Sequence, residues 1–208
     1  MSIVKAMLST GIYPDFITID GAEGGTGAAP VEFSNRLGMP CLEATYFVNQ
    51  VLIGAGLRSK LRIISAGKTA TGFDLLTKMA LGADSVNSAR AMMLALGCVQ
   101  SKSCNTNKCP TGIATTDPAR AKAIDVDDKS RRVSNYHAGT VEALMDLCGA
   151  LGYDDPIKLR PTDLFQRVGK DLKHFDQIYT PLSSGQLLTT SIPETYAEDW
   201  LKASSESF

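Results

Sequence analysis

Short apolar runs that each lead into a turn of small residues constrain the fold more than any other feature. The first run, Phe16–Ile19, leads into a glycine cluster, and runs at 61–65 and 85–87 lead into further turns. Strands that alternate with helices imply a parallel sheet with right-handed crossovers. A doubly wound sheet and a (β/α)8 barrel both fit this pattern. A barrel needs eight strands and about 250 residues, so this α/β chain would hold only its last part.

Helical periodicity connects the strands and continues after them. Residues 181–208 are rich in Ser and Thr with weak periodicity, which predicts a tail that is disordered or docked on a partner. We expect a barrel portion at 1–114, a helical extension at 115–180 and the tail at 181–208. The predicted helices cover residues 30–37, 42–53, 73–81, 89–96, a segment capped by Asp127 or Asp128 that ends near Ala150, and 159–168.

Composition excludes several classes of protein. The net charge is −1 with scattered Lys and Arg, which argues against a nucleic-acid-binding face. No apolar run reaches about 18 residues, so we expect no membrane span. The first residues lack the apolar core of a signal peptide, and we expect a cytoplasmic protein.

The small-residue turns fit a ligand that carries phosphate. In barrels, a phosphate often lies at helix N-termini on the loops after the last strands. A tight turn, a solvated Lys68 or a structural Arg90 would explain the same residues, and the glycines match neither the dinucleotide fingerprint nor the P-loop. The candidate residues are Gly24, Gly25, Thr26, Gly27, Ser65, Gly67, Lys68, Gly72, Asn87 and Arg90.

Three of the five cysteines form a group. Cys98, Cys104 and Cys109 lie within twelve residues, and Pro110 follows the last. Thiolates suit iron–sulfur clusters or zinc, and three ligands fit a three-iron cluster. A structural zinc site normally needs a fourth ligand, and no histidine is near in sequence. Unligated thiols remain a third reading. Cys41 and Cys148 read as small buried hydrophobes.

Four ordered segments resemble the FMN-binding synthase domain of glutamate synthases, and the likeness is strongest to its stand-alone, glutamate-synthase-related branch. The resemblance covers roughly residues 5–168. The segments are Tyr13–Pro30, Gly67–Asp74, Gly82–Arg90 and Leu96–Gly112, the last resembling the family's three-iron, four-sulfur (3Fe-4S) cluster loop.

The resemblance implies a (β/α)8 TIM-type barrel that holds FMN at its C-terminal face, with the ten turn residues lining the flavin and the cysteine trio holding the cluster. It implies reductive amination of 2-oxoglutarate to glutamate through 2-iminoglutarate. The electron donor would be an NADPH-linked subunit or ferredoxin. The resemblance assigns no proton donor; Glu23 lies in the right loop but fits a solvated carboxylate equally well.

The chain departs from the family pattern because the earlier barrel strands, a glutaminase domain and an NADPH-binding domain are not visible in it. The missing barrel half or a homo-oligomer partner would have to cover the unpaired strand edges. Two alternatives stay open. One is another FMN barrel enzyme, such as an isopentenyl-diphosphate isomerase-like protein, which would not explain the cysteines. The other is a non-catalytic fragment or subunit that assembles with a full synthase.

Overall fold

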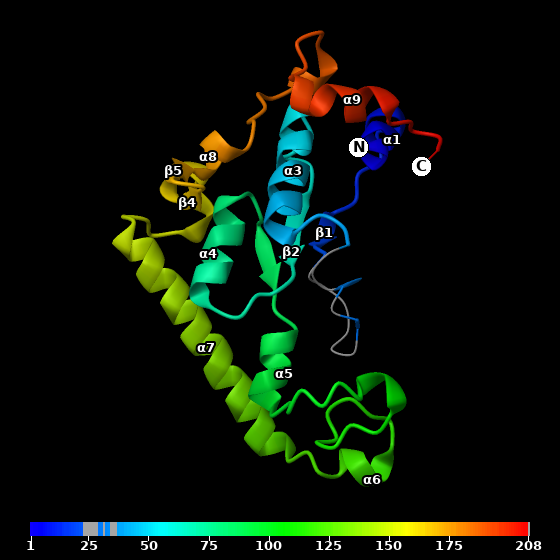
Figure 1. The fold of residues 1–208 in the computed structure, drawn as a ribbon, viewed down its shortest axis with the longest axis vertical. Coiled ribbons are helices and arrows are strands. Elements are labelled where there is room, and N and C mark those ends of the chain that lie inside the picture. Colours follow the sequence, from blue (N-terminus) through cyan, green and yellow to red (C-terminus); the bar gives the residue numbers. More distant parts are fainter. Residues whose placement is uncertain (23–28, 31, 34–36, 208) are drawn as a thin grey trace.

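A computed structural model describes residues 1–22, 29–30, 32–33 and 37–207 (Figure 1). The strands are β1 (Phe16–Asp20), β2 (Arg62–Ala66), β3 (Ser85–Asn87), β4 (Phe165–Val168) and β5 (Asp171–His174). The helices are α1 (Ser2–Thr10), α3 (Cys41–Gly54), α4 (Gly72–Ala80), α5 (Arg90–Leu96), α6 (Pro118–Ala121), α7 (Val126–Ala150), α8 (Phe175–Ile178) and α9 (Glu194–Lys202). Single 3-10 turns are η1 (Cys104–Thr106), η2 (Pro156–Lys158), η3 (Pro161–Asp163) and η4 (Gln186–Leu188).

Strands β1, β2 and β3 form a parallel sheet in that order. Helix α3 lies in the crossover from β1 to β2, and α4 lies in the crossover from β2 to β3. Asp20, Ala66 and Asn87 form one row across the C-terminal ends of the three strands. The predicted parallel α/β arrangement is confirmed. The strands that the structure describes do not close into a barrel, so the barrel stays a prediction.

The two faces of this sheet have different surroundings. Ile19, Ile63 and Ser65 are buried, and Ser65 contacts α3. Phe16 and Thr18, which point to the other face because strand side chains alternate, are exposed. The buried face therefore carries the core, and the opposite face is exposed at Phe16 and Thr18 of β1.

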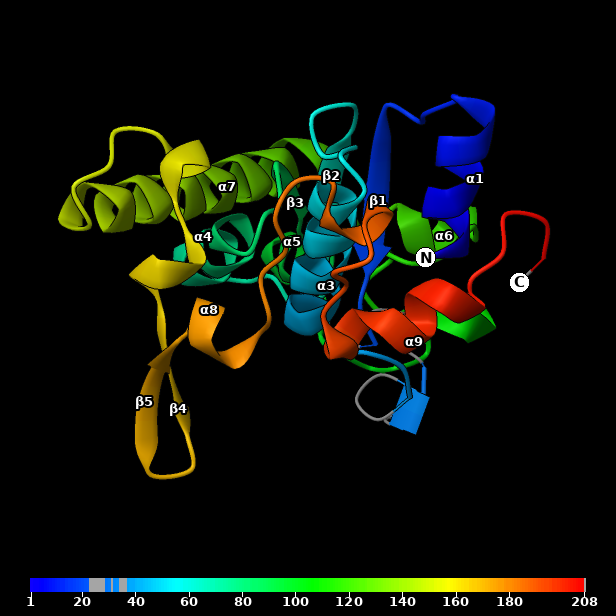
Figure 2. The same ribbon diagram turned by 90° about the horizontal axis from the view of Figure 1, so that it is seen from above.

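The core on the buried face also includes the two ends of the chain. Leu182, Leu187, Tyr196 and Trp200 pack with residues of α1 and α3. Helices α1 and α9 lie beside each other near both termini (Figures 1 and 2), and Lys5 Nζ donates to the Ala203 carbonyl at 2.8 Å. The described part of the predicted tail, residues 181–207, thus packs on the chain itself through these side chains, which differs from the disordered or partner-docked tail that the sequence suggested.

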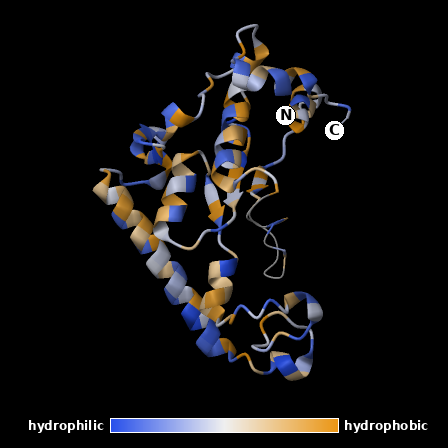
Figure 3. Ribbon diagram, viewed as in Figure 1, coloured by the Kyte–Doolittle hydropathy of each residue, from blue (hydrophilic) through white to orange (hydrophobic). Residues whose placement is uncertain are grey.

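A second apolar cluster joins α4 to the long helix α7. Leu76, Leu144 and Cys148 are buried in it. A Cβ at Gly72 would lie 2.7 Å from the backbone nitrogen of Leu144, so glycine lets α4 begin this close to α7. Figure 3 shows a mostly hydrophilic N-terminal half of α7 and a more hydrophobic C-terminal half. The helix is therefore anchored at α4 and more polar toward the cysteine loop.

Side-chain caps set where two of these helices begin. Thr71 and Asp74 form a capping box at α4, because each side chain accepts a hydrogen bond from the other residue's backbone N–H. Helix α7 is capped by Asp125, whose Oδ1 accepts the Asp128 N–H at 3.0 Å. The prediction that Asp127 or Asp128 caps this helix is therefore wrong by two or three residues, and both lie in its first turn.

The predicted helix at 159–168 is wrong. The structure has the turn η3 there, followed by the antiparallel hairpin of β4 and β5. Pro161 begins η3, and Gly169, with φ 64°, allows the tight reversal between the strands. A glycine with left-handed backbone favours a hairpin over a continued helix.

Candidate functional site

The turns after β2 and β3 meet at the C-terminal edge of the sheet. Ser88 Oγ donates to the Thr69 carbonyl at 2.8 Å and ties one turn to the other. Asn87 ends β3 in the same row as Ala66 and is exposed. The structure thus brings together two of the three turns that the sequence indicated. Gly24, Gly25, Thr26 and Gly27 of the first turn, with Glu23, lie outside the described residues.

The turn after β2 has an unusual backbone. Gly67 has φ 142° and Lys68 has φ 40°. A left-handed conformation at a residue with a side chain is uncommon and clusters at ligand-binding positions. Within the described ranges, Lys68 shares this property with three other non-glycine residues, all in the cysteine loop.

The other predicted turn residues lie in varied surroundings. Ser65 is fully buried, and its hydroxyl lies 2.8 Å from Thr45 Oγ1 and 3.2 Å from Cys41 Sγ. Gly72 packs against α7 as described above. Arg90 begins α5 and is exposed. The Ser65 hydroxyl therefore bonds to α3, and Gly72 serves helix packing. Their assignment to a cofactor site stays a prediction.

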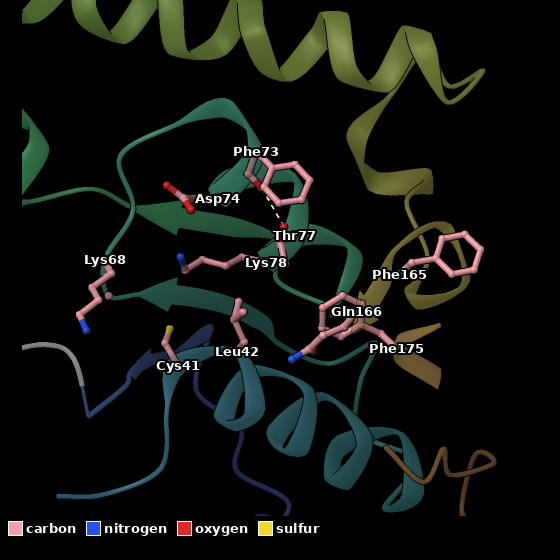
Figure 4. Close-up of a pocket in the computed structure, with 11 residues that line it drawn as sticks. Cys41, Leu42, Lys68, Phe73, Asp74, Thr77, Lys78, Phe165, Gln166 and Phe175 are labelled. Carbon is pink, nitrogen blue, oxygen red and sulfur yellow. Dashed lines mark hydrogen bonds between the residues drawn. The ribbon is translucent and has the colours of Figure 1, made fainter. Parts of the chain in front are cut away.

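A cavity of about 410 Å³ lies beside the Gly67–Lys68 turn (Figure 4). The N-terminus of α3 contributes Cys41 and Leu42. The β4–β5 hairpin and α8 close the other side with aromatic rings. Its lining is Cys41, Leu42, Gly67, Lys68, Phe73, Asp74, Thr77, Lys78, Phe165, Gln166 and Phe175.

Two charged residues of α4 line this cavity one helical turn apart. Burial alone would raise the pKa of Asp74, but N–H groups of Ala70 and Thr71 donate to its carboxylate and hold the pKa below its usual value. The ammonium of Lys78, a residue that is only 3% exposed, adds to this lowering of the pKa. The cavity therefore combines a fixed carboxylate with a buried cation.

The sequence reading missed the contribution of Cys41, Asp74 and Lys78. Cys41 is buried as predicted, yet its thiol also contacts the Ser65 hydroxyl and the Ala66 carbonyl at 3.3 Å. The pattern Thr71-x-x-Asp74 was a usable signal for a helix start, and Lys78 lies four residues later on the same side of that helix. Nothing in the sequence places Cys41 against β2.

The cysteine loop begins where α5 ends. Gly97, with φ 102°, terminates α5, and Cys98 follows it. Cys104 opens η1, and Cys109 is buried. Gln100, Lys102 and Asn107 have left-handed backbone within this loop, so it holds three strained residues between its first and last thiol.

Cys109 has the surroundings of a thiolate. Thr111 Oγ1 lies 3.4 Å from its sulfur. The Thr111 hydroxyl, together with backbone N–H groups of Ala114, Thr111 and Ile113, lowers the pKa of Cys109 to about 7 against the opposing effect of burial. Donors of this kind stabilise a sulfur that carries negative charge.

Thiolate chemistry fits an iron–sulfur cluster, although the three thiols do not form one group among the described residues. In the part of the chain that the structure describes, no three His, Cys, Asp or Glu side chains are grouped closely enough to hold a metal ion. Cys98 Sγ instead accepts the Gln100 N–H at 3.5 Å. The loop would have to draw Cys98 and Cys104 toward Cys109 to form one coordination sphere. The cluster therefore stays a prediction.

Comparison with known proteins defines the class. Residues 2–154 match the family described as the conserved region in glutamate synthase. This segment spans the parallel sheet, the joined turns and the cysteine loop. The chain therefore belongs to the glutamate synthase family, and the resemblance inferred from its motifs is confirmed.

Individual relatives place the chain more closely. It is 46% identical over 151 residues to the glutamate synthase large subunit-like protein YerD of Bacillus subtilis (strain 168), covering 73% of this chain and 29% of that protein. It is 37% identical over 163 residues to the archaeal glutamate synthase (NADPH) of Methanocaldococcus jannaschii, covering 78% and 32%. The chain thus spans about three-tenths of the length of these relatives. No helix among the described residues is long and apolar enough to cross a membrane.

Proposed function

We propose that this chain is part of a glutamate synthase-like oxidoreductase that reductively aminates 2-oxoglutarate to glutamate through 2-iminoglutarate. The observation that carries the proposal is the order of features within residues 2–154. Two turns tied together by Ser88 and Thr69 at the C-terminal edge of a parallel sheet precede a thiol-rich loop, all inside the matched family region. Catalysis at that edge is the rule for parallel α/β barrels.

The predicted residues would divide the work of binding two cofactors. The turns with Gly24, Gly25, Thr26 and Gly27, with Gly67, Lys68 and Gly72, and with Asn87 and Arg90 would hold FMN. Cys98, Cys104 and Cys109 would hold a 3Fe-4S cluster. When bound, FMN supplies hydride chemistry and the cluster supplies one-electron transfer.

The chain's own residues would orient these groups. The Ser88–Thr69 hydrogen bond keeps the turns after β2 and β3 at a fixed separation. The exposed Asn87 side chain and the Arg90 guanidinium at the start of α5 lie beside them and can hydrogen-bond an anionic group. The donors around Cys109 favour its ligating, deprotonated form.

The proposed partners follow from the small fraction of its relatives' length that this chain covers. Because it spans about three-tenths of YerD and of the archaeal relative, we propose that the other barrel strands, from a longer chain or a second copy, complete the flavin site. The electron donor would be an NADPH-linked subunit or ferredoxin, and the site of action the cytoplasm. The second candidate function is that of a non-catalytic subunit that assembles with a full synthase. The short part of the relatives' length that this chain covers favours it.

Anaerobic reconstitution with iron, sulfide and FMN tests the proposal. We expect bound iron and acid-labile sulfide in the wild-type chain, and a loss of about tenfold in metal affinity or more in C109S, because a ligand thiolate is removed. The matched control is C148A, which removes a thiol buried between α4 and α7. Equal iron in wild type, C109S and C148A would refute the cluster. Flavin retention, measured separately by fluorescence, tests the FMN site. The activity is tested by measuring the glutamate formed from 2-oxoglutarate after this chain has been joined to the remaining barrel strands of a relative.

A further inference from the structure

The cavity between α3, α4 and the β4–β5 hairpin contains Lys78, a cation that the Asp74 carboxylate attracts without forming an ion pair with it. Lys78 is 3% exposed. None of the ion pairs or hydrogen bonds between described residues involves its ammonium. The buried side-chain atoms that lack a hydrogen bond do not include the Lys78 nitrogen, so this nitrogen keeps accessible surface where the residue lines the cavity. An acceptor that entered the cavity would pair with it, as buried lysines are normally paired.

The nearest carboxylate is already used for another purpose. Asp74 Oδ2 accepts the N–H groups of Ala70 and Thr71 at 2.9 Å each and the Thr71 hydroxyl at 3.0 Å. These three bonds hold the carboxylate at the start of α4, where it caps the helix. Asp74 therefore attracts Lys78 through its charge without a hydrogen bond between them, and the N–H donors of the ammonium remain available to a ligand.

The side chains of the cavity divide into a polar end and an apolar end. Figure 4 shows the Lys78 nitrogen directed toward the end where Asp74 and Cys41 lie, with Phe165 and Phe175 at the opposite end. Leu42 and Phe73 add further apolar lining. A volume of about 410 Å³ falls within the range of small-molecule sites, which are mostly apolar with few placed polar groups.

We propose that this cavity binds a small organic anion with a flat apolar body, whose negative group pairs with Lys78 and whose body packs against the phenylalanines. The anionic head would be a carboxylate or a phosphate, since either forms a charge-assisted hydrogen bond to an ammonium. The ring-bearing end would lie under the hairpin.

Gly67 and Lys68, two of the proposed flavin residues, border this cavity, but the rest of its lining comes from α3, α4, the β4–β5 hairpin and α8. The Ser65 hydroxyl and Cys41 thiol that contact each other beside the cavity lie on the helix-covered face of β2. The hairpin and α8 that close the cavity lie after residue 154, where the family match ends. The proposal therefore does not rest on FMN binding, although the Gly67–Lys68 turn borders both regions.

Calorimetric titration with matched probes tests the site. The probes are phenylacetate and phenyl phosphate, with 2-phenylethanol as the neutral analogue. We expect at least one anion to bind about tenfold more tightly than the alcohol, and K78M to lose about tenfold of that affinity. K60M, at an exposed lysine away from the cavity, is the control and should leave binding unchanged. Equal affinity for the alcohol and both anions, or an unaltered affinity in K78M, would overturn the proposal.

Amide NMR shifts of the wild-type chain keep the test decisive if K78M does not fold. We expect the bound anion to shift amides of residues 73–78 and 165–166, which come from the two walls of the cavity. Shifts confined to other parts of the chain would refute the site. Displacement of the probe by FMN would also refute it, because the cavity would then belong to the flavin site.

Discussion

The parallel sheet with its helices and the cysteine loop at 98–117 are stabilised in different ways. In the sheet region, leucines such as Leu52 and Leu81 are 0% exposed, and the Asp84 carboxylate accepts the Ile63 N–H at 2.7 Å. In the loop, Gln100, Lys102 and Asn107 adopt left-handed backbone, and Cys109 and Gly112 are the only buried residues between 98 and 117.

This difference indicates where stability is stored and where it is absent. Apolar burial contributes most of the folding free energy, and the sheet region has it. The loop instead depends on local hydrogen bonds, and strain of this kind is found at functional sites. Changes in the sheet region should therefore unfold the whole chain, whereas changes in the loop should act locally.

The largest effect is expected from a cavity in the sheet region. L52A removes a fully buried side chain from α3 and should lower the free energy of unfolding by about 2–5 kcal/mol. Urea unfolding followed by circular dichroism measures this. L201A, at a 75% exposed leucine of α9, is the control and should change stability by less than about 0.5 kcal/mol. Similar losses in both variants would show that the buried cluster is not the main source of stability.

Replacing Asp84 tests the polar part of the same region. Asp84 receives the Ile63 N–H and pairs with Arg58 at 2.8 Å and Arg62 at 3.2 Å, which joins β2 to the segment before β3. D84N keeps the size but loses the charge, and should cost about 1–3 kcal/mol in urea unfolding because an acceptor for charged donors is weakened. The control D154N alters an exposed ion pair with Lys158 and should have little effect. A larger loss in D154N would contradict this ranking.

Local sequence patterns predicted the sheet region well and the site less well. The strands at 16–20, 62–66 and 85–87 are short apolar runs before glycine or small residues, so each could be located from its own residues. The contact of Cys41 with Ser65 joins residues 24 positions apart through a crossover, which no local pattern reveals.

The C-terminal part was the hardest to predict for the same physical reason. Leu187 and Trp200 are buried only because the chain returns to α3 and α1, although their own segments look polar and irregular. The hairpin strands have four residues each, too short for their periodicity to outweigh a helical reading. Helix α1 was also not predicted. The three cysteines were found by spacing, but spacing does not show that their sulfurs are apart in this structure.

A smaller and local effect is expected in the cysteine loop. Asn107 Oδ1 accepts the Thr116 N–H at 2.7 Å and the Thr115 hydroxyl at 2.9 Å, which closes the loop. N107A removes this acceptor and a residue that tolerates left-handed backbone, so local opening should become about 1–2 kcal/mol easier. Hydrogen exchange at residues 104–117 should accelerate, while exchange in β2 stays unchanged. Accelerated exchange throughout the sheet would show that the two regions unfold together.

The smallest effect is a pH dependence that belongs to the loop alone. The pKa of Cys109 is about 7 in the folded chain, below its ordinary value of 9.0. Between these two values the unfolded chain holds a proton that the folded chain has released, so this thiol makes stability rise as pH increases from about 7 to 9. The same contribution is lost as pH falls through about 7. Urea unfolding of metal-free protein at several pH values should show this rise in wild type and in C148A but not in C109S, where the thiol is replaced by a hydroxyl that does not titrate in this range. A rise of equal size in C109S would assign the pH dependence to other groups and remove the case for a preformed thiolate at the end of the loop.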